Sequence, residues 1–121
     1  RIIATDISAS ALTIANENAK RHHVDARIQL LQGALLVPLS ALKEPFFIVS
    51  NPPYIPDKTM LMDDVALFEP HQALFAGKEG LDVLVPLLKE ASRDPLCMGW
   101  AVECREDQIA SLLQFQPLAP L

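Results

Sequence analysis

The sequence predicts an α/β protein in which helices cover both faces of a doubly wound, mostly parallel sheet. Three observations predict this fold class. Short apolar strand patterns alternate with helical patterns along the 121 residues. Half of the residues are hydrophobic, which provides enough apolar surface for the core of one domain. Glycines and prolines fall between the apolar segments, where the chain has to turn.

The first half of the chain contains three strand patterns and one helix pattern. The strand patterns are short apolar runs over residues 2–5, 27–32 and 46–50. Ser8 is a favourable cap for a helix over residues 9–22, because its hydroxyl can accept a hydrogen bond from a free backbone N–H group. The first strand ends on Asp6 and the second on Gly33.

The second half is less regular. Residues 57–77 give mixed signals, with a short helix expected inside residues 60–68, and Gly77 and Gly80 mark a turn. The remaining expected elements are a helix from the cap Asp82 to about Arg93, a strand over 100–103 and a helix over 105–115 on which Ile109, Leu112 and Leu113 face inward. Residues 116–121 fit neither pattern.

Charge and cysteine content narrow the classes of partner. The formal net charge is −5, and the basic cluster Lys20–His23 is too small to bind a polyanion strongly. No apolar run approaches the roughly 20 residues that a membrane span needs. Cys97 and Cys104 match no metal-binding or redox spacing, and two reduced cysteines are typical of a cytoplasmic protein. A protein or a small molecule is therefore the expected partner, with no metal and no membrane.

Polar residues follow three of the predicted strands. Asp6, Gly33-Ala34 and the tetrapeptide Asn51-Pro52-Pro53-Tyr54 each lie at the carboxyl end of a strand, where ligands bind in open parallel sheets. An acid in the position of Asp6 accepts hydrogen bonds from a ribose diol or forms a local turn. Position alone leaves both roles open.

The tetrapeptide, called the corner below, is the most specific feature. Pro52 and Pro53 fix the backbone and contribute no N–H donors, so a carbonyl and the Asn51 side-chain oxygen are free to accept. Two acceptors suit a planar NH₂ group, and Tyr54 offers a flat ring and a hydroxyl beside it. Such acceptors favour the nucleophilic form of an amide or amino nitrogen facing a methyl sulfonium. The alternative is a rigid turn that merely ends a strand.

Three separate blocks of sequence resemble one enzyme family. "ATDISASALTIANENAK", "IVSNPPYIP" and "FEPHQALFAGKEGLDVL" are similar to segments of the release-factor glutamine methyltransferases, the HemK/PrmC family. The resemblance covers about residues 1–113 and leaves 114–121 as an unassigned tail. It implies a Rossmann-like class I methyltransferase domain that uses S-adenosyl-L-methionine.

The resemblance also implies roles for individual residues. Asp6 would bind the ribose hydroxyls of the cofactor, and Leu35 would pack on its adenine ring. Asn51 would touch both the methionine part of the cofactor and the target amide. Pro52 would accept the second amide hydrogen through its carbonyl, while Pro53 and Tyr54 shape the slot. The substrate would be the glutamine of the Gly-Gly-Gln loop in peptide chain release factors.

The sequence departs from the family pattern in four places. The first central strand with its glycine-rich loop, the amino-terminal helical domain and the C-terminal hairpin are not recognisable. Ala34 stands where the family usually has an acid that meets the adenine amino group. We therefore expect residues 1–121 to be a partial catalytic domain, a fragment that folds poorly alone because two half-sheets expose their edges.

Two other functions stay open at this point. The same corner serves methylation of adenine or cytosine amino groups in nucleic acid, although the acidic balance and residues 68–84 disfavour it. The chain could also be an inactive truncated remnant. The oligomeric state is not predicted.

Overall fold

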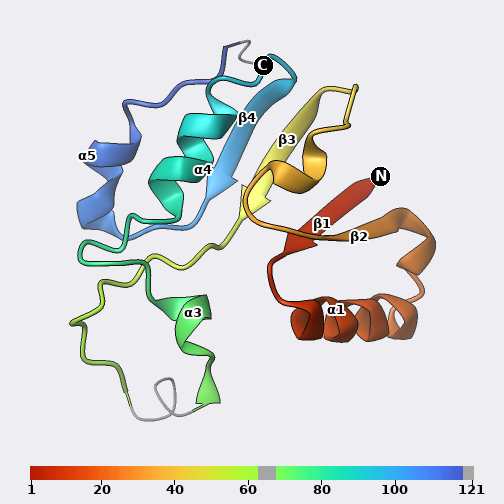
Figure 1. The fold of residues 1–121 in the computed structure, drawn as a ribbon, viewed down its shortest axis with the longest axis horizontal. Helices are drawn as coiled ribbons and strands as arrows, with labels where there is room; N and C mark the ends of the chain where they lie inside the picture. Colours follow the sequence, from red (N-terminus) through yellow and green to blue (C-terminus); the bar gives the residue numbers. More distant parts are fainter. Residues whose placement is uncertain (63–67, 119–121) are drawn as a thin grey trace. The chain divides into compact units, whose positions relative to one another are not determined.

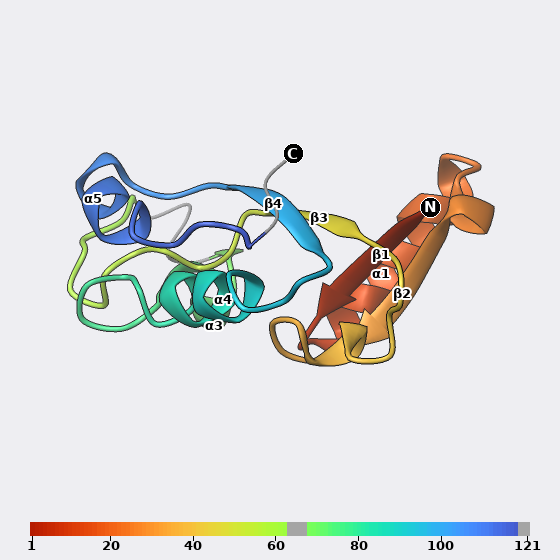
Figure 2. The same ribbon diagram turned by 90° about the horizontal axis from the view of Figure 1, so that it is seen from above.

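The computed structural model describes residues 1–62 and 68–118. The chain forms two compact units, residues 1–42 (unit 1) and residues 43–121 (unit 2). Each unit contains a two-stranded parallel sheet with helices beside it (Figures 1 and 2). The predicted α/β class with parallel strands is therefore confirmed. The doubly wound strand order and the absent central strand stay predictions.

Unit 1 is a strand–helix–strand motif. Its elements are β1 (Ile2–Asp6), α1 (Ala9–Arg21), a 3₁₀ turn over Asp25–Arg27, β2 (Ile28–Gln32) and a second 3₁₀ turn over Val37–Leu39. The two strands pair in parallel from Ile2 opposite Ile28 to Asp6 opposite Gln32. The helix α1 packs along both strands (Figure 1). Its Ala19 is buried. All strands and the helix of this unit lie within one residue of their expected positions.

The start of α1 depends on Ser8. The Ser8 hydroxyl accepts a hydrogen bond from the N–H group of Ala11 at 3.2 Å, as the sequence predicts. We expect Ser8→Ala to lower the free energy of unfolding by about 1 kcal/mol. Urea denaturation measures this loss, and Ser8→Asp, which keeps an acceptor at the cap, is the matched control. Equal losses in the two variants would contradict the capping role.

Unit 2 is built around β3 (Phe46–Ser50) and β4 (Cys97–Val102), which pair in parallel. Its helices are α3 (His71–Leu74), α4 (Leu84–Ala91) and α5 (Ile109–Leu112), with a 3₁₀ turn over Glu106–Gln108 before α5. Leu84, Leu88 and Leu112 form the buried centre of this unit. Tyr54, at the end of the corner, and Trp100 on β4 pack against this centre. The core of unit 2 thus supports the segment that follows β3.

Two elements of unit 2 begin at positions that the sequence did not predict. The expected cap of α4 at Asp82 is wrong, because Val83 is the capping residue and makes no side-chain cap bond. The backbone N–H of Asp82 instead donates to the Ala76 carbonyl at 3.1 Å. The strand β4 begins three residues earlier than expected, since Cys97 and Gly99 pair with Phe46 and Phe47.

Three helix ends also differ from the expected ones. The helix α4 ends at Ala91, because the N–H group of Arg93 turns back to the Glu90 carbonyl at 3.0 Å. The helix expected over 105–115 is replaced by the 3₁₀ turn and the four residues of α5. Leu112 is buried as predicted, but Ile109 and Leu113 are 45% and 66% exposed, so their inward orientation was wrong.

The segment after the corner contains a helix that the pattern did not reveal. Met60, Leu61 and Met62 are not helical, and residues 63–67 of the short helix expected there lie outside the described residues. The helix α3 follows Pro70, whose φ of −60° suits the position before a helical turn. The ring of His71 stacks on that of Phe75 at a centroid distance of 4.4 Å, which agrees with a structural role for His71.

Candidate functional site

The corner leaves β3 and joins a short backbone bridge. Pro52 is buried and Pro53 and Tyr54 are half-buried, whereas Asn51 is exposed. The chain then pairs with the end of α3, where the N–H group of Ile55 donates to the Leu74 carbonyl at 3.0 Å. The corner is therefore held between the sheet of unit 2 and this bridge.

The two acceptors expected at the corner make no bonds to the rest of the described chain. Within residues 1–62 and 68–118, no hydrogen bond involves the Asn51 carboxamide or the Pro52 carbonyl. Proline nitrogens carry no hydrogen, so the corner supplies no donor of its own at positions 52 and 53. This arrangement is compatible with a site that accepts hydrogen bonds from a bound NH₂ group.

Tyr54 is fixed at both its side chain and its backbone. Its hydroxyl donates to Glu103 Oε1 at 2.5 Å, and its carbonyl accepts from Gln108 Nε2 at 2.9 Å. The phenol hydrogen is thus engaged within the protein and is not available to a ligand. The ring face remains the part of Tyr54 that could shape a substrate slot.

The same hydrogen bond shifts the pKa of Tyr54, so its contribution to stability depends on pH. Its hydrogen bond to Glu103 raises the pKa of Tyr54 above the ordinary value near 10, and partial desolvation and the charge of Glu103 act in the same direction. Because folding raises the pKa of Tyr54, the protonated phenol and its bond to Glu103 stabilise the folded protein below a pH of about 10. This stabilisation is lost as the pH rises through the folded-state pKa.

A difference titration tests this effect in the full-length protein, meaning the 121 residues together with any sequence that flanks them. Tyrosinate absorbance is titrated in the original protein and in Tyr54→Phe, and the difference between the two curves belongs to Tyr54. We expect this difference to have a midpoint above pH 10. Glu103→Gln should return that midpoint toward the ordinary value, since a neutral amide repels the phenolate less than a carboxylate does. A midpoint that Glu103→Gln leaves unchanged would disprove the coupling.

Two of the three residues expected to bind the cofactor, Asp6 and Leu35, lie in unit 1, and Asn51 lies in unit 2. The N–H group of Gly33 donates to the Asp6 carbonyl at 3.0 Å, which joins the carboxyl ends of β1 and β2. Asp6 Oδ1 accepts a hydrogen bond from the N–H group of Ser8 at 2.8 Å, so the turn-forming role of Asp6 is real. Asp6 Oδ2 makes no hydrogen bond in the described part of the chain. One oxygen of this exposed carboxylate therefore remains for a ligand.

Leu35 has an unusual backbone conformation beside this edge. Its φ of 49° lies in the left-handed region, which non-glycine residues adopt at a cost of about 1–3 kcal/mol. The preceding Ala34 carbonyl accepts from the N–H group of Val37 at 3.1 Å and closes the turn. Ala34 has no side-chain acceptor, so in this unit it offers nothing to an adenine amino group.

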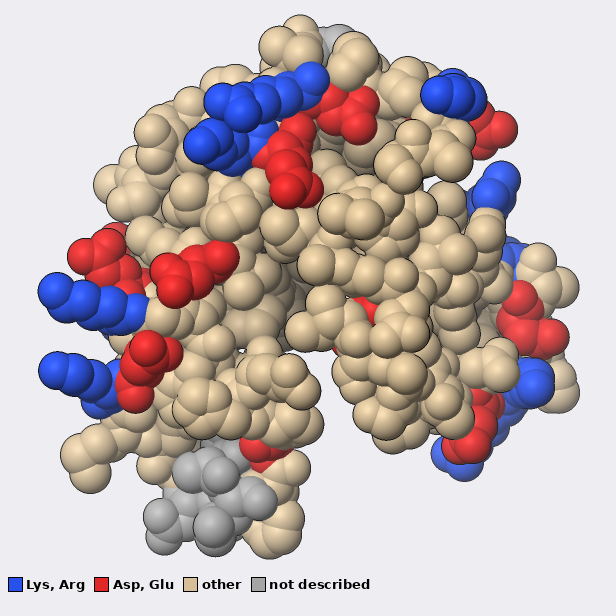
Figure 3. All heavy atoms as spheres, viewed as in Figure 1, with Lys and Arg blue, Asp and Glu red and all other residues tan. Residues whose placement is uncertain are grey.

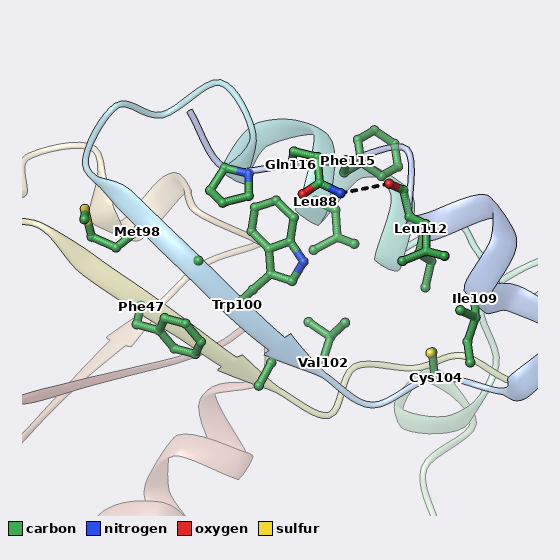
Figure 4. Close-up of a pocket in the computed structure, with 14 residues that line it drawn as sticks. Phe47, Leu88, Met98, Trp100, Val102, Cys104, Ile109, Leu112, Phe115 and Gln116 are labelled. Atoms are coloured by element: carbon green, nitrogen blue, oxygen red, sulfur yellow. Dashed lines mark hydrogen bonds between the residues drawn. The ribbon is translucent and has the colours of Figure 1, made fainter. Parts of the chain in front are cut away.

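An apolar groove in unit 2 is a poor candidate for the site. Figure 4 shows Trp100, Leu112 and Phe115 lining it between β4 and the chain around α5. Its one side-chain amide, Gln116, donates to the Leu113 carbonyl at 3.0 Å. No residue of the corner lines this groove. Its lining lacks the converging polar groups that catalysis requires.

The face drawn in Figure 3 and the described residues carry no strong signal for other classes of ligand. On the face drawn in Figure 3, basic and acidic side chains are interspersed without a continuous basic patch. The described residues contain no group of three or more His, Cys, Asp or Glu side chains arranged to hold a metal ion. No helix formed by these residues has the length and apolar character needed to cross a membrane.

Three residues at the corner escaped prediction from the sequence. Glu103 and Gln108 bind Tyr54 from 49 and 54 residues away, and Gly80 packs against its carbonyl. A local signal existed only for Gln108. Its Oε1 accepts from the N–H group of Arg105 at 3.0 Å, and a glutamine three residues after the start of a helical turn is typical of such caps.

Comparisons with known proteins agree with the resemblance. No protein-family model matches the chain. A release factor glutamine methyltransferase of Moorella thermoacetica is 48% identical over 94 residues, which cover 76% of this chain and 32% of that protein. One of Deinococcus radiodurans is 43% identical over 93 residues, or 75% of this chain and 32% of the relative. One of Synechocystis sp. is 39% identical over 121 residues, or 92% of this chain and 40% of the relative.

The matches identify the family of the chain and show how much of its relatives the chain covers. Identities of 40–48% over about three quarters of the chain are shared by several relatives of one name. The chain spans about a third of the length of these curated relatives. With Asn51 exposed at the corner behind β3, these matches establish that the chain belongs to the release factor glutamine methyltransferase (HemK/PrmC) family.

Proposed function

We propose that the full-length protein methylates the side-chain amide nitrogen of the glutamine in the Gly-Gly-Gln loop of peptide chain release factors. The methyl group comes from S-adenosyl-L-methionine. The observation that carries this proposal is the corner, where Asn51 is exposed and its carboxamide and the Pro52 carbonyl make no described hydrogen bond. The names of the relatives indicate the class of substrate.

The corner acts on the amide nitrogen through hydrogen bonds. The Asn51 side-chain oxygen and the Pro52 carbonyl each accept one hydrogen of the target NH₂ group. Those bonds draw the lone pair out of conjugation with the carbonyl and strengthen as positive charge develops on nitrogen. With these bonds in place, the nitrogen would accept the methyl group that the cofactor supplies and would then lose one proton to solvent. Pro53 and the Tyr54 ring limit where the glutamine side chain lies.

The residues proposed to hold the cofactor are Asp6, Leu35 and Asn51. The cofactor supplies an electrophilic methyl group on a sulfonium centre. Asp6 retains one unbonded carboxylate oxygen for the ribose hydroxyls, while Leu35 presents an apolar side chain for the adenine ring. Ala34 supplies no acceptor for the adenine amino group, so these residues fit the ribose better than the adenine edge.

A methyl-transfer assay tests the proposal with the full-length protein. S-adenosylmethionine carrying a tritiated methyl group is incubated with the protein and with either a release factor or double-stranded DNA. We expect label in the release factor, lost when the Gly-Gly-Gln glutamine is replaced by glutamate. Label in DNA alone would show that the corner serves nucleobase amino groups. Absence of label in both substrates would contradict the proposed function.

A further inference from the structure

Gln108 is a polar side chain in the otherwise apolar interior of unit 2. It is 4% exposed, and it is the one buried polar or charged side chain among residues 1–62 and 68–118. Burial of a side-chain amide is unfavourable unless hydrogen bonds replace those that it makes with water. Its bonds therefore show what the fold uses this amide for.

The Gln108 amide joins three separate segments. Its Nε2 donates to the carbonyls of Tyr54 at 2.9 Å, Glu79 at 2.9 Å and Gly80 at 3.1 Å. An NH₂ group has two hydrogens, so three acceptors share them. Its Oε1 accepts from the backbone N–H group of Arg105 at 3.0 Å. The end of the corner, the glycine turn and the start of the last helical segment thus meet at one side chain.

The corner depends on such outside bonds more than an ordinary turn does. Pro52 and Pro53 have no N–H groups with which to stabilise the backbone between them. The bonds at its two ends come from residues 103–108. Glu103 donates its N–H group to the Ser50 carbonyl at 3.0 Å, and Glu103 Oε1 and Gln108 Nε2 bind Tyr54. Residues 103–108 therefore fix the corner before Asn51 and after Pro53.

We propose that Gln108 is a positioning residue for methyl transfer. It acts through the Tyr54 carbonyl, fixes the end of the corner, and so holds the Asn51 and Pro52 oxygens where the target amide arrives. This inference rests on the proposed function. A misplacement of about 1 Å at a reacting centre lowers turnover by about 100-fold, so a loose corner mainly reduces kcat.

Variants of similar size at position 108 test the proposal in the full-length protein. Gln108→Met removes both hydrogens without adding charge, and Gln108→Glu places a carboxylate against three carbonyl oxygens. Gln114→Met and Gln114→Glu are matched controls, because Gln114 is exposed and donates only locally, to the Ser111 carbonyl at 2.7 Å. Methylation of a release factor is measured at a temperature at which circular dichroism shows every variant folded.

The readout separates positioning from general support of the fold. We expect kcat to fall at least about 10-fold in both Gln108 variants, with KM for S-adenosylmethionine within about 3-fold of its original value. The Gln114 variants should keep kcat within about 2-fold. A Gln108→Met protein that melts earlier but retains kcat would overturn the proposal, as would an equal loss in the Gln114 variants.

A second readout does not require activity. The ring resonances of Tyr54, assigned by comparison with Tyr54→Phe, should shift and broaden in Gln108→Met and stay unchanged in Gln114→Met. If the original protein methylates no release factor, the proposed function fails, and these resonances still decide whether Gln108 holds the corner. Unchanged Tyr54 resonances in Gln108→Met would overturn the inference even in an active enzyme.

Discussion

Asn51→Ala in the full-length protein is expected to lower kcat for release-factor methylation by about 100-fold while the melting temperature stays unchanged. Removal of a preorganised hydrogen-bonding group that acts in the transition state has an effect of this size. Stability should not change, because the Asn51 side chain is exposed and makes no hydrogen bond in the described chain. Steady-state kinetics with a release factor, together with thermal denaturation, measure the two quantities.

Asn16→Ala is the matched control for this experiment. Asn16 is an exposed asparagine on α1, and its replacement should leave kcat unchanged and should not lower the melting temperature, because alanine favours the helix more than asparagine does. If Asn51→Ala lowered stability and turnover in proportion, the corner would be a structural turn that ends β3. If Asn51→Ala kept full turnover, Asn51 would have no part in the reaction.

Gly80→Ala is expected to lower the free energy of unfolding by about 3 kcal/mol or more. The φ of Gly80 is +70°, where a residue with a side chain is strained by about 1–3 kcal/mol. The added Cβ atom would also lie 2.2 Å from the Tyr54 carbonyl oxygen and 2.7 Å from Gln108 Nε2. Both neighbours belong to the packed surroundings of the corner, so overlap forces the backbone apart. Chemical denaturation measures this loss.

Gly77→Ala separates the steric overlap from the backbone strain. Gly77 has a similar φ of +78°, but the three atoms nearest to its added Cβ atom would all belong to the Asp82 carboxylate, a side chain that can rotate away. We expect a smaller loss of stability in Gly77→Ala and little change in kcat, whereas Gly80→Ala also reduces kcat by displacing Tyr54. Equal effects on stability and turnover would show that strain alone explains Gly80.

Local sequence patterns were sufficient to predict the strands and the helix of unit 1 and the strand before the corner. The cap at Ser8, the apolar run of β3 and the proline pair are features that a short window of sequence contains. They predicted the elements because the same local interactions form in the folded chain. The family resemblance rested on these segments and on residues 68–84, and the relatives confirm it.

Distant contacts explain what the sequence did not reveal. Gly99 interrupts the strand pattern of β4, yet it pairs opposite Phe47, whose ring covers it and leaves no room for a side chain. Asp82 resembled a helix cap, but its backbone was already bound to the Ala76 carbonyl. The partners of Tyr54 lie some 50 residues along the chain, and no local window contains them.

Because the chain is synthesised from its amino terminus, the corner is made before the residues that bind it. A nascent chain that has emerged only as far as Tyr54 carries the complete corner sequence but none of the three bonds from Glu103 and Gln108. The geometry proposed for the reaction therefore forms only after translation has passed residue 108 and that stretch has cleared the ribosomal tunnel. Nonsense codons between positions 55 and 102 should yield products that keep every proposed substrate-binding side chain and methylate nothing.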